Sequence, residues 1–124
     1  MKKPFIIIAL LVSTWVVFDF LSGSSESEEK NGWTRLTGED IANALNDRKL
    51  RYDGAWQEFF SNGRTLFYAA GESWGEWEVK GDRYCSKWSP DPGWNCYSLE
   101  KHLDGRLRFN NGFADPTEGR YTDR

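Results

Sequence analysis

Hydrophobic and polar positions alternate in the segment from Ser73 to Lys80. One face carries Gly75, Trp77 and Val79, and the opposite face carries Glu76, Glu78 and Lys80, with Trp74 before them. A period of two residues is typical of a β-strand with one buried face. The segment therefore predicts a strand that turns Trp77 towards a core.

Other short segments of similar composition follow one another along the chain and are separated by turn residues. They are residues 49–52, 56–61, 65–69, 83–88, 94–100, 106–109 and 120–122. Asn62-Gly63 is a strong hairpin signal, and the tight turns leave no room for the long crossovers that parallel pairing needs. Residues 112–119 are expected to be irregular. The pattern predicts a mainly β fold, an antiparallel up-and-down meander that forms a small barrel or a curled sheet.

One short N-terminal α-helix is predicted before these strands. Ile41 and Leu45 are four positions apart, which places both on the same helix face. Thr37 is expected to be the N-cap and to form an approximate capping box with Asp40. Asn46-Asp47 is expected to end the helix.

The beginning of the chain predicts export. Lys2 and Lys3 precede an apolar run from Phe5 to Phe18, and small residues follow at 22–25. This order is typical of a secretory signal. Residues 1–24 are therefore expected to be a signal peptide or an N-terminal membrane anchor, with residues 5–21 as the possible tether.

The domain boundaries follow from the same change in composition. Residues 25–32 are polar and acidic, which predicts a disordered linker. Residues 33–122 are expected to form a single β-rich domain. The protein is expected to be exported and periplasmic, either soluble or N-terminally anchored.

Composition changes the expected core. The 124 residues include 7 tryptophans, 5 tyrosines and 8 phenylalanines. Large aliphatic residues are few after position 25, so rings are expected to fill the space between the strands. The formal net charge of −3 excludes a strongly basic nucleic-acid-binding protein.

The two cysteines are expected to form a disulfide. Cys85 and Cys96 lie in the two strands that flank a proline-rich loop. If Trp88 faces Gly93 across this loop, the two cysteines are directly opposite each other and within disulfide range. The same register pairs Tyr84 with Tyr97. A disulfide agrees with an exported small domain.

Candidate catalytic groups are weak in this sequence. His102 is the one histidine and lies beside a predicted turn, where an exposed histidine is the ordinary interpretation. Glu76 and Glu78 share a strand face at a spacing that could suit sugar chemistry, but a solvated face of a half-buried strand is the ordinary interpretation. No catalytic residue, metal site or cofactor is expected, and an enzyme is the least favoured interpretation.

The surplus of rings leaves two hypotheses open. If the sheet closes, its interior is a candidate ligand site, with Trp77, Tyr84, Tyr97, Phe67 and Phe109 as its lining. A barrel this small can also be filled by these same side chains. Alternatively, exposed tryptophans form an interaction surface. Its candidates are Trp74, Trp88 and Trp94.

A family resemblance supports the fold. Leu36-Thr37-Gly38 before a short helix, an Asn-Gly turn, the segment from Gly75 to Cys85, and Cys96-Tyr97 together resemble small exported alphaproteobacterial proteins of unknown function. The resemblance covers residue 36 to about residue 110. It implies a lipocalin-like (calycin-like) meander and carries over no functional residue.

The sequence thus predicts an exported cell-envelope protein that binds a small apolar or ring-bearing ligand. The alternative is a membrane-tethered module that contacts a protein or the cell wall through its tryptophans. The expected partner is an unknown small ligand or an envelope component, and no nucleic acid.

Overall fold

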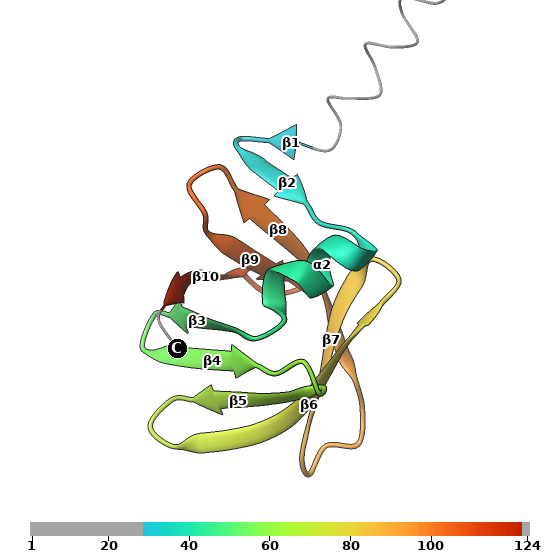
Figure 1. Cartoon of the computed structure of the whole chain (residues 1–124), viewed down its shortest axis with the longest axis vertical. Helices are drawn as coiled ribbons and strands as arrows, with labels where there is room; N and C mark the ends of the chain where they lie inside the picture. Colours follow the sequence, from blue (N-terminus) through green and yellow to red (C-terminus); the bar gives the residue numbers. More distant parts are fainter. Residues whose placement is uncertain (1–28, 123–124) are drawn as a thin grey trace, which may run out of the picture. The chain divides into compact units, whose positions relative to one another are not determined.

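The sheet of this protein closes on itself as a barrel (Figure 1). The computed structural model describes residues 29–122. The chain divides into two units, residues 1–31 and 32–124, and the described part of the first contains the two-residue strand β1 (Glu29–Lys30). Everything below concerns the second unit. The expected signal or anchor (1–24) and the first part of the expected linker (25–28) lie outside the described residues.

The second unit contains one helix and nine strands. In chain order they are β2 (Trp33–Arg35), α2 (Gly38–Leu45), β3 (Arg48–Tyr52), β4 (Ala55–Phe59), β5 (Arg64–Tyr68), β6 (Glu72–Lys80), β7 (Arg83–Trp88), β8 (Asn95–His102), β9 (Leu107–Asn110) and β10 (Thr117–Thr122). Among residues 29–122, no helix is long and apolar enough to cross a membrane.

Eight strands form the barrel, and each is antiparallel to its neighbours. β3 to β10 pair in chain order, and β10 completes the ring by pairing with β3. β2 lies outside this ring and pairs with the second half of β8. The predicted mainly β, antiparallel up-and-down fold is confirmed, and its closed form is the barrel rather than the curled sheet.

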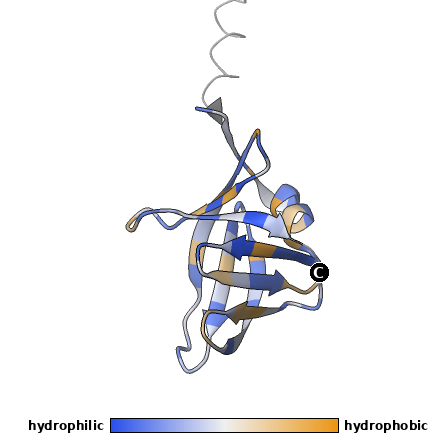
Figure 2. Ribbon diagram, turned by 90° about the vertical axis from the view of Figure 1, so that its left-hand side faces the viewer, coloured by the Kyte–Doolittle hydropathy of each residue, from blue (hydrophilic) through white to orange (hydrophobic). Residues whose placement is uncertain are grey.

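Hydrophilic and hydrophobic residues alternate along the strands (Figure 2). In β6, Trp77 is buried while Glu76 and Glu78 are exposed, as the alternation predicts. Because successive strands run up and down, α2 and the β6–β7 turn lie at one end of the barrel. The β3–β4, β5–β6 and β7–β8 connections lie at the other end.

Two strand assignments differ from the sequence-based expectation. β2 was not expected, because three residues are too few to show an alternation. β10 begins at Thr117, so the predicted irregular segment 112–119 is wrong in its last part. Thr117 and Gly119 pair with β9 opposite Phe109 and Leu107. Backbone groups form this pairing. A Thr-Glu-Gly sequence has no hydrophobic alternation that would predict a strand.

The helix has the predicted bounds but a different N-terminal cap. Thr37 occupies the N-cap position, yet its side chain makes no capping hydrogen bond, so the expected capping box is wrong. Instead, the Gly38 N–H donates to Asp82 Oδ1 of the β6–β7 turn at 3.0 Å, and the Asp40 N–H donates to the Thr37 carbonyl oxygen at 2.7 Å. A neighbouring turn therefore supplies the acceptor that the helix end needs.

The core is mixed rather than purely aromatic, which corrects the composition argument. Its buried cluster contains Ile41, Leu45, Leu50, Leu99 and Leu107, which are all fully buried, together with Phe59, Trp77, Tyr84 and Phe109. Five of the few aliphatic residues thus occupy fully buried positions. Phe59 contacts three of the rings, at centroid distances of 5.7 Å to Trp77, 5.8 Å to Tyr84 and 6.4 Å to Phe109.

The disulfide has the predicted partners and register. Cys85 pairs with Cys96 across β7 and β8, with Cα atoms 4.0 Å apart, and Tyr84 pairs with Tyr97. Both cysteines are consumed in this bond.

Candidate functional site

A cavity of about 760 Å³ lies inside the barrel beside the core cluster. Asp53 of the β3–β4 turn and Ser89 of the β7–β8 loop belong to its lining, so the cavity reaches the end of the barrel that lies opposite α2. Seven aromatic residues line it: six with inward-facing rings, which are Tyr52, Phe67, Tyr84, Trp88, Tyr97 and Phe109, and the exposed Trp74.

The rings of the cavity wall support one another edge to face. Phe109 packs against Tyr84 at 5.2 Å and against Tyr97 at 6.5 Å between centroids. Trp88 packs against Phe67 at 6.1 Å. Offset and edge-to-face arrangements of this kind are the favoured geometries of aromatic pairs, so the wall is held in shape by its own members.

Four of the five residues predicted to line a ligand site do line the cavity: Tyr84, Tyr97, Phe67 and Phe109. Trp77 does not. Its ring packs against Phe59, and its Nε1–H donates to the Phe60 carbonyl oxygen at 2.9 Å, so it belongs to the core.

Sequence reasoning assigned none of the other lining residues to a ligand site, and these include Tyr52, Gln57 and Trp88. For Tyr52 and Gln57 the signal was present. Tyr52 alternates with buried Leu50, and Gln57 alternates with buried Phe59, which places both on the inner face. A glutamine at such a position is easily assigned to solvent from its polarity alone.

A hydrogen-bonded network centred on Gln57 forms part of the cavity wall. Tyr52 Oη–H donates to Gln57 Oε1 at 2.7 Å, and Gln57 Nε2 donates to Thr65 Oγ1 at 2.9 Å and to Tyr84 Oη at 3.3 Å. Thr65 in turn donates to the Glu58 carbonyl oxygen at 2.8 Å. The Thr65 proton is thereby committed, which fixes the orientation of the amide and makes Tyr52 the donor to its oxygen.

Burial keeps the two phenols of this network neutral. Desolvation is the main cause that raises the pKa of Tyr84 to about 12, and hydrogen bonds from Ser86 and Gln57 offset part of this effect. The pKa of Tyr52 is also raised, first by burial and then by the nearby Tyr84. The wall therefore disfavours negative charge.

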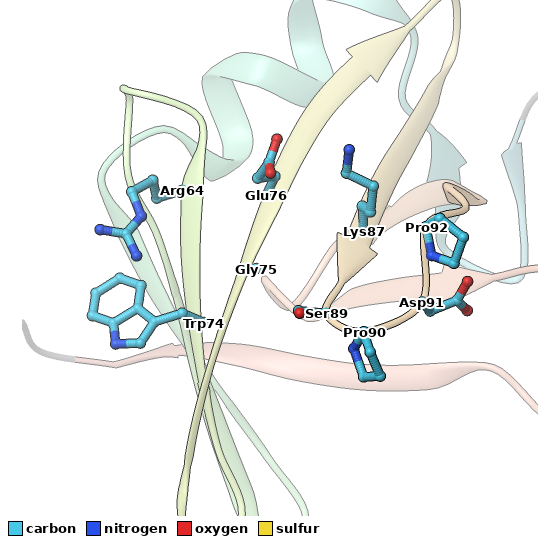
Figure 3. Close-up of a pocket in the computed structure, with 9 residues that line it drawn as sticks. All are labelled: Arg64, Trp74, Gly75, Glu76, Lys87, Ser89, Pro90, Asp91 and Pro92. Atoms are coloured by element: carbon cyan, nitrogen blue, oxygen red, sulfur yellow. The ribbon is translucent and has the colours of Figure 1, made fainter.

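A second, smaller groove of about 420 Å³ lies on the outer face of β6 and β7 (Figure 3). Trp74 and Arg64 lie on one side of it, Glu76 and Lys87 project above the sheet, and the Pro90–Pro92 loop closes the other side. The Arg64 guanidinium lies 4.3 Å from the centroid of the Trp74 ring. This groove is polar and mixed in charge.

The three tryptophans of the predicted interaction surface lie in different surroundings. Trp74 is exposed, with 44% of its surface accessible. Trp94 is half-buried, with the Lys80 and Lys87 ammonium groups 4.7 Å and 5.0 Å from its ring centroid. Trp88 faces the cavity, where its Nε1–H donates to Ser86 Oγ at 3.1 Å. Trp74 and Trp88 both belong to the lining of the cavity, whereas Trp94 does not.

The weak catalytic candidates are placed as follows. Glu76 lines the outer groove, whereas Glu78 pairs with Lys80 at 3.1 Å on the exposed face. His102 packs edge-on against Trp33 at 4.8 Å, and its Nδ1 lies 3.0 Å from Asp104 Oδ1. In the described part of the chain, no group of three or more His, Cys, Asp or Glu side chains could hold a metal ion.

Comparison of the chain with protein-family models, with curated proteins and with solved structures gives no match.

Proposed function

We propose that this is an exported, periplasmic protein that binds a small apolar or ring-bearing ligand inside its barrel. The observation that carries the proposal is the cavity of about 760 Å³ with seven aromatic rings in its lining. Ligand pockets are typically concave, mostly apolar and about 300–1,000 Å³ in volume. The closed up-and-down barrel also agrees with the lipocalin-like form that the sequence resemblance implies.

Export is supported by two independent features. The basic and then apolar beginning of the chain is typical of a secretory signal. The Cys85–Cys96 disulfide is a bond that persists in oxidising compartments. Fractionation of the native host, followed by mass spectrometry of the intact protein, reports the compartment, the N-terminal residue and the oxidation state together. Recovery of the reduced, full-length chain from the cytoplasm would contradict this part of the proposal.

Ligand binding is tested with a neutral fluorescent ring compound, N-phenyl-1-naphthylamine. We expect saturable binding of one molecule per chain, accompanied by a blue shift of the emission as the probe leaves water. The variant Ala55→Trp places a bulky ring at an inward-facing position of the cavity wall. The ring should fill part of the cavity and weaken binding of the probe at least about tenfold.

The matched control adds the same ring at the other end of the barrel. Ser61 is exposed and uses only its backbone N–H, which donates to Asp47 Oδ1. Ser61→Trp should therefore bind the probe as the unaltered protein does. Equal binding by the unaltered protein, Ala55→Trp and Ser61→Trp would locate the probe outside the cavity. Absence of probe binding to the folded, unaltered protein would contradict the proposed ligand binding.

A second candidate function is that of a membrane-tethered interaction module. Its supporting observation is the exposed Trp74 beside the outer groove. Photo-crosslinking from position 74 in the native host, compared with position 120 on another exposed strand, tests it. A specific adduct at position 74 supports this function, and identical patterns at both positions contradict it.

A further inference from the structure

We infer that the ligand of the barrel cavity is an organic cation, held by the faces of the aromatic rings and by the Asp53 carboxylate. This inference rests on the proposed function and names the chemical class of its ligand.

The charge of the cavity wall is negative. Among the described residues that line the cavity there is no lysine, arginine or histidine, and Asp53 is the one charged side chain. Asp53 is exposed in the β3–β4 turn, and no ion pair joins it to a basic side chain among residues 29–122. Its negative charge is therefore available to a ligand that enters from this end.

The inner and outer rings of the barrel differ in their contacts with cations. On the outside, cations already cover rings: the Lys49 ammonium lies 4.2 Å from the Trp56 centroid, and the Arg64 guanidinium lies 4.3 Å from the Trp74 centroid. Trp74, whose exposed ring also lines the cavity, is the one cavity ring with a cation–π contact in the described part of the chain; the six inward-facing rings have none. These inner rings can accept a cation from a ligand.

The polar groups of the wall include the Gln57 amide. Both N–H groups of Gln57 are used within the network, and its oxygen accepts from Tyr52. The amide therefore offers no free donor to a carboxylate or phosphate. The raised pKa values of Tyr52 and Tyr84 come first from burial, which penalises a charge of either sign. The amide offers an anion nothing to offset this penalty, whereas ring faces compensate the desolvation of a cation.

Three benzyl compounds that differ in charge separate the alternatives. Benzyltrimethylammonium is the cation, neopentylbenzene is its neutral isostere, and phenylacetate is a small anion with the same ring. Displacement of N-phenyl-1-naphthylamine gives their relative affinities for the full-length folded protein. We expect the cation to bind at least about tenfold more tightly than the neutral isostere, and the anion to bind most weakly.

Each other result has a defined meaning. If the neutral compound binds as tightly as the cation, or the anion binds best, the inference is overturned while the proposed function stands. If none of the three compounds nor the fluorescent probe binds, the inference and the proposed function both fail.

Two variants test the assigned groups. Asp53→Asn keeps the size of an exposed turn residue and removes its charge, so affinity for the cation should fall about three- to tenfold at low salt while the neutral isostere is unaffected. Trp88→Leu keeps an apolar side chain but removes a ring face, so the cation should lose more affinity than the isostere. Glu39→Gln, an equal change of charge on α2 at the other end, is the control and should change neither.

Thermal melts of each variant establish that it is folded before binding is compared. Asp53 is exposed, so its variant should retain the stability of the parent. An equal loss of affinity for the cation and for the neutral isostere in Asp53→Asn and Trp88→Leu would overturn the role of charge and ring faces.

Discussion

Two glycines on the inner face of the barrel leave the space that two cavity rings occupy. A Cβ atom at Gly75 would lie 2.6 Å from Cε3 of Trp88, and a Cβ atom at Gly119 would lie 2.8 Å from Cε1 of Tyr52. A glycine inside a strand often marks such a close approach. The shape of the cavity wall therefore depends on residues that have no side chain of their own.

Gly75→Ala should destabilise the protein by about 1–3 kcal/mol, because the added methyl group overpacks a rigid indole and the Lys87 carbonyl oxygen at 2.8 Å. Urea denaturation followed by circular dichroism gives the change in the free energy of unfolding. Gly93→Ala is the control, since its nearest neighbour is a side-chain oxygen at 3.6 Å. Equal stability of the two variants would contradict the close packing of Trp88.

The buried phenol of Tyr84 predicts how stability changes at high pH. Its pKa is about 12 in the folded protein and about 10 in the unfolded chain, so unfolding releases a proton between these values. The stabilising contribution is complete below pH 10 and is lost as the pH rises from 10 to 12. The loss is on the order of 3 kcal/mol.

The measurement compares urea midpoints of the unaltered protein and Tyr84→Phe at several values of pH between 8 and 11.5. The variant cannot ionise at this position, so its stability should decline less steeply above pH 10. Parallel pH profiles would show that the Tyr84 phenol ionises as readily in the folded barrel as in the unfolded chain.

At the scale of elements, α2 depends on its tertiary contacts. It is only eight residues long, and its side-chain anchors Ile41 and Leu45 are fully buried. Isolated helices of this length are unstable in water, so packing and the contact from the β6–β7 turn must hold it in place. Tyr121 of β10 adds a further contact, because its Oη–H donates to the Ala44 carbonyl oxygen at 2.7 Å.

The cap of α2 gives a prediction in which sequence and structure disagree. Thr37→Ala should change the free energy of unfolding by less than about 0.5 kcal/mol, because the hydroxyl makes no capping bond. Asp82→Ala should cost about 0.5–1.5 kcal/mol, because the Gly38 N–H loses its acceptor. Asp82→Asn retains that acceptor and should recover most of the loss. Chemical denaturation of the three variants measures these changes. A larger loss of stability in Thr37→Ala than in Asp82→Ala would support the capping box instead.

The disulfide is expected to stabilise the hairpin of β7 and β8. It links residues 11 positions apart and so restricts the unfolded chain, which is worth about 3 kcal/mol for a loop of this size. Reduction, and the double variant Cys85→Ala with Cys96→Ala, should lower the urea midpoint by similar amounts. If the variant loses much more than the reduced protein does, the cost comes from the packing of the buried Cys85 rather than from the cross-link.

At the scale of the whole molecule, the features that the sequence predicts are the local ones. The alternation in β6, the Asn62-Gly63 turn and the opposed cysteines each depend on residues close in the chain, and all three are present. The same alternation placed four of five candidate residues at the cavity. Trp77 was wrongly assigned to the cavity and lies in the core instead. The alternation shows that its side chain points inward but not at which level of the barrel it lies.

The remaining features depend on contacts between distant parts of the chain. The cap that Asp82 provides to α2 joins residues 44 positions apart. The closure of the barrel joins β10 to β3, from opposite ends of the domain, through backbone groups. Neither a turn signal nor a hydrophobic period encodes such a partner. The choice between barrel and curled sheet therefore could not be made from the sequence.

Closure itself can be tested by removing β10. This strand pairs with β9 and β3, so a chain that ends at Asp115 leaves two strand edges without partners. Such edges favour association, and the truncated chain should lose cooperative unfolding or oligomerise. Size-exclusion chromatography and thermal melts measure both outcomes.

A synthetic peptide of residues 116–124 should restore the monomer and the cooperative transition by filling the gap in the ring. The same peptide with Gly119→Val should fail, because a Cβ atom at this position meets the Tyr52 ring at 2.8 Å. Rescue by both peptides would mean that β10 binds without facing the barrel interior. Unchanged folding of the truncated chain would mean that the ring does not need its last strand, in which case the cavity would be formed by the other seven.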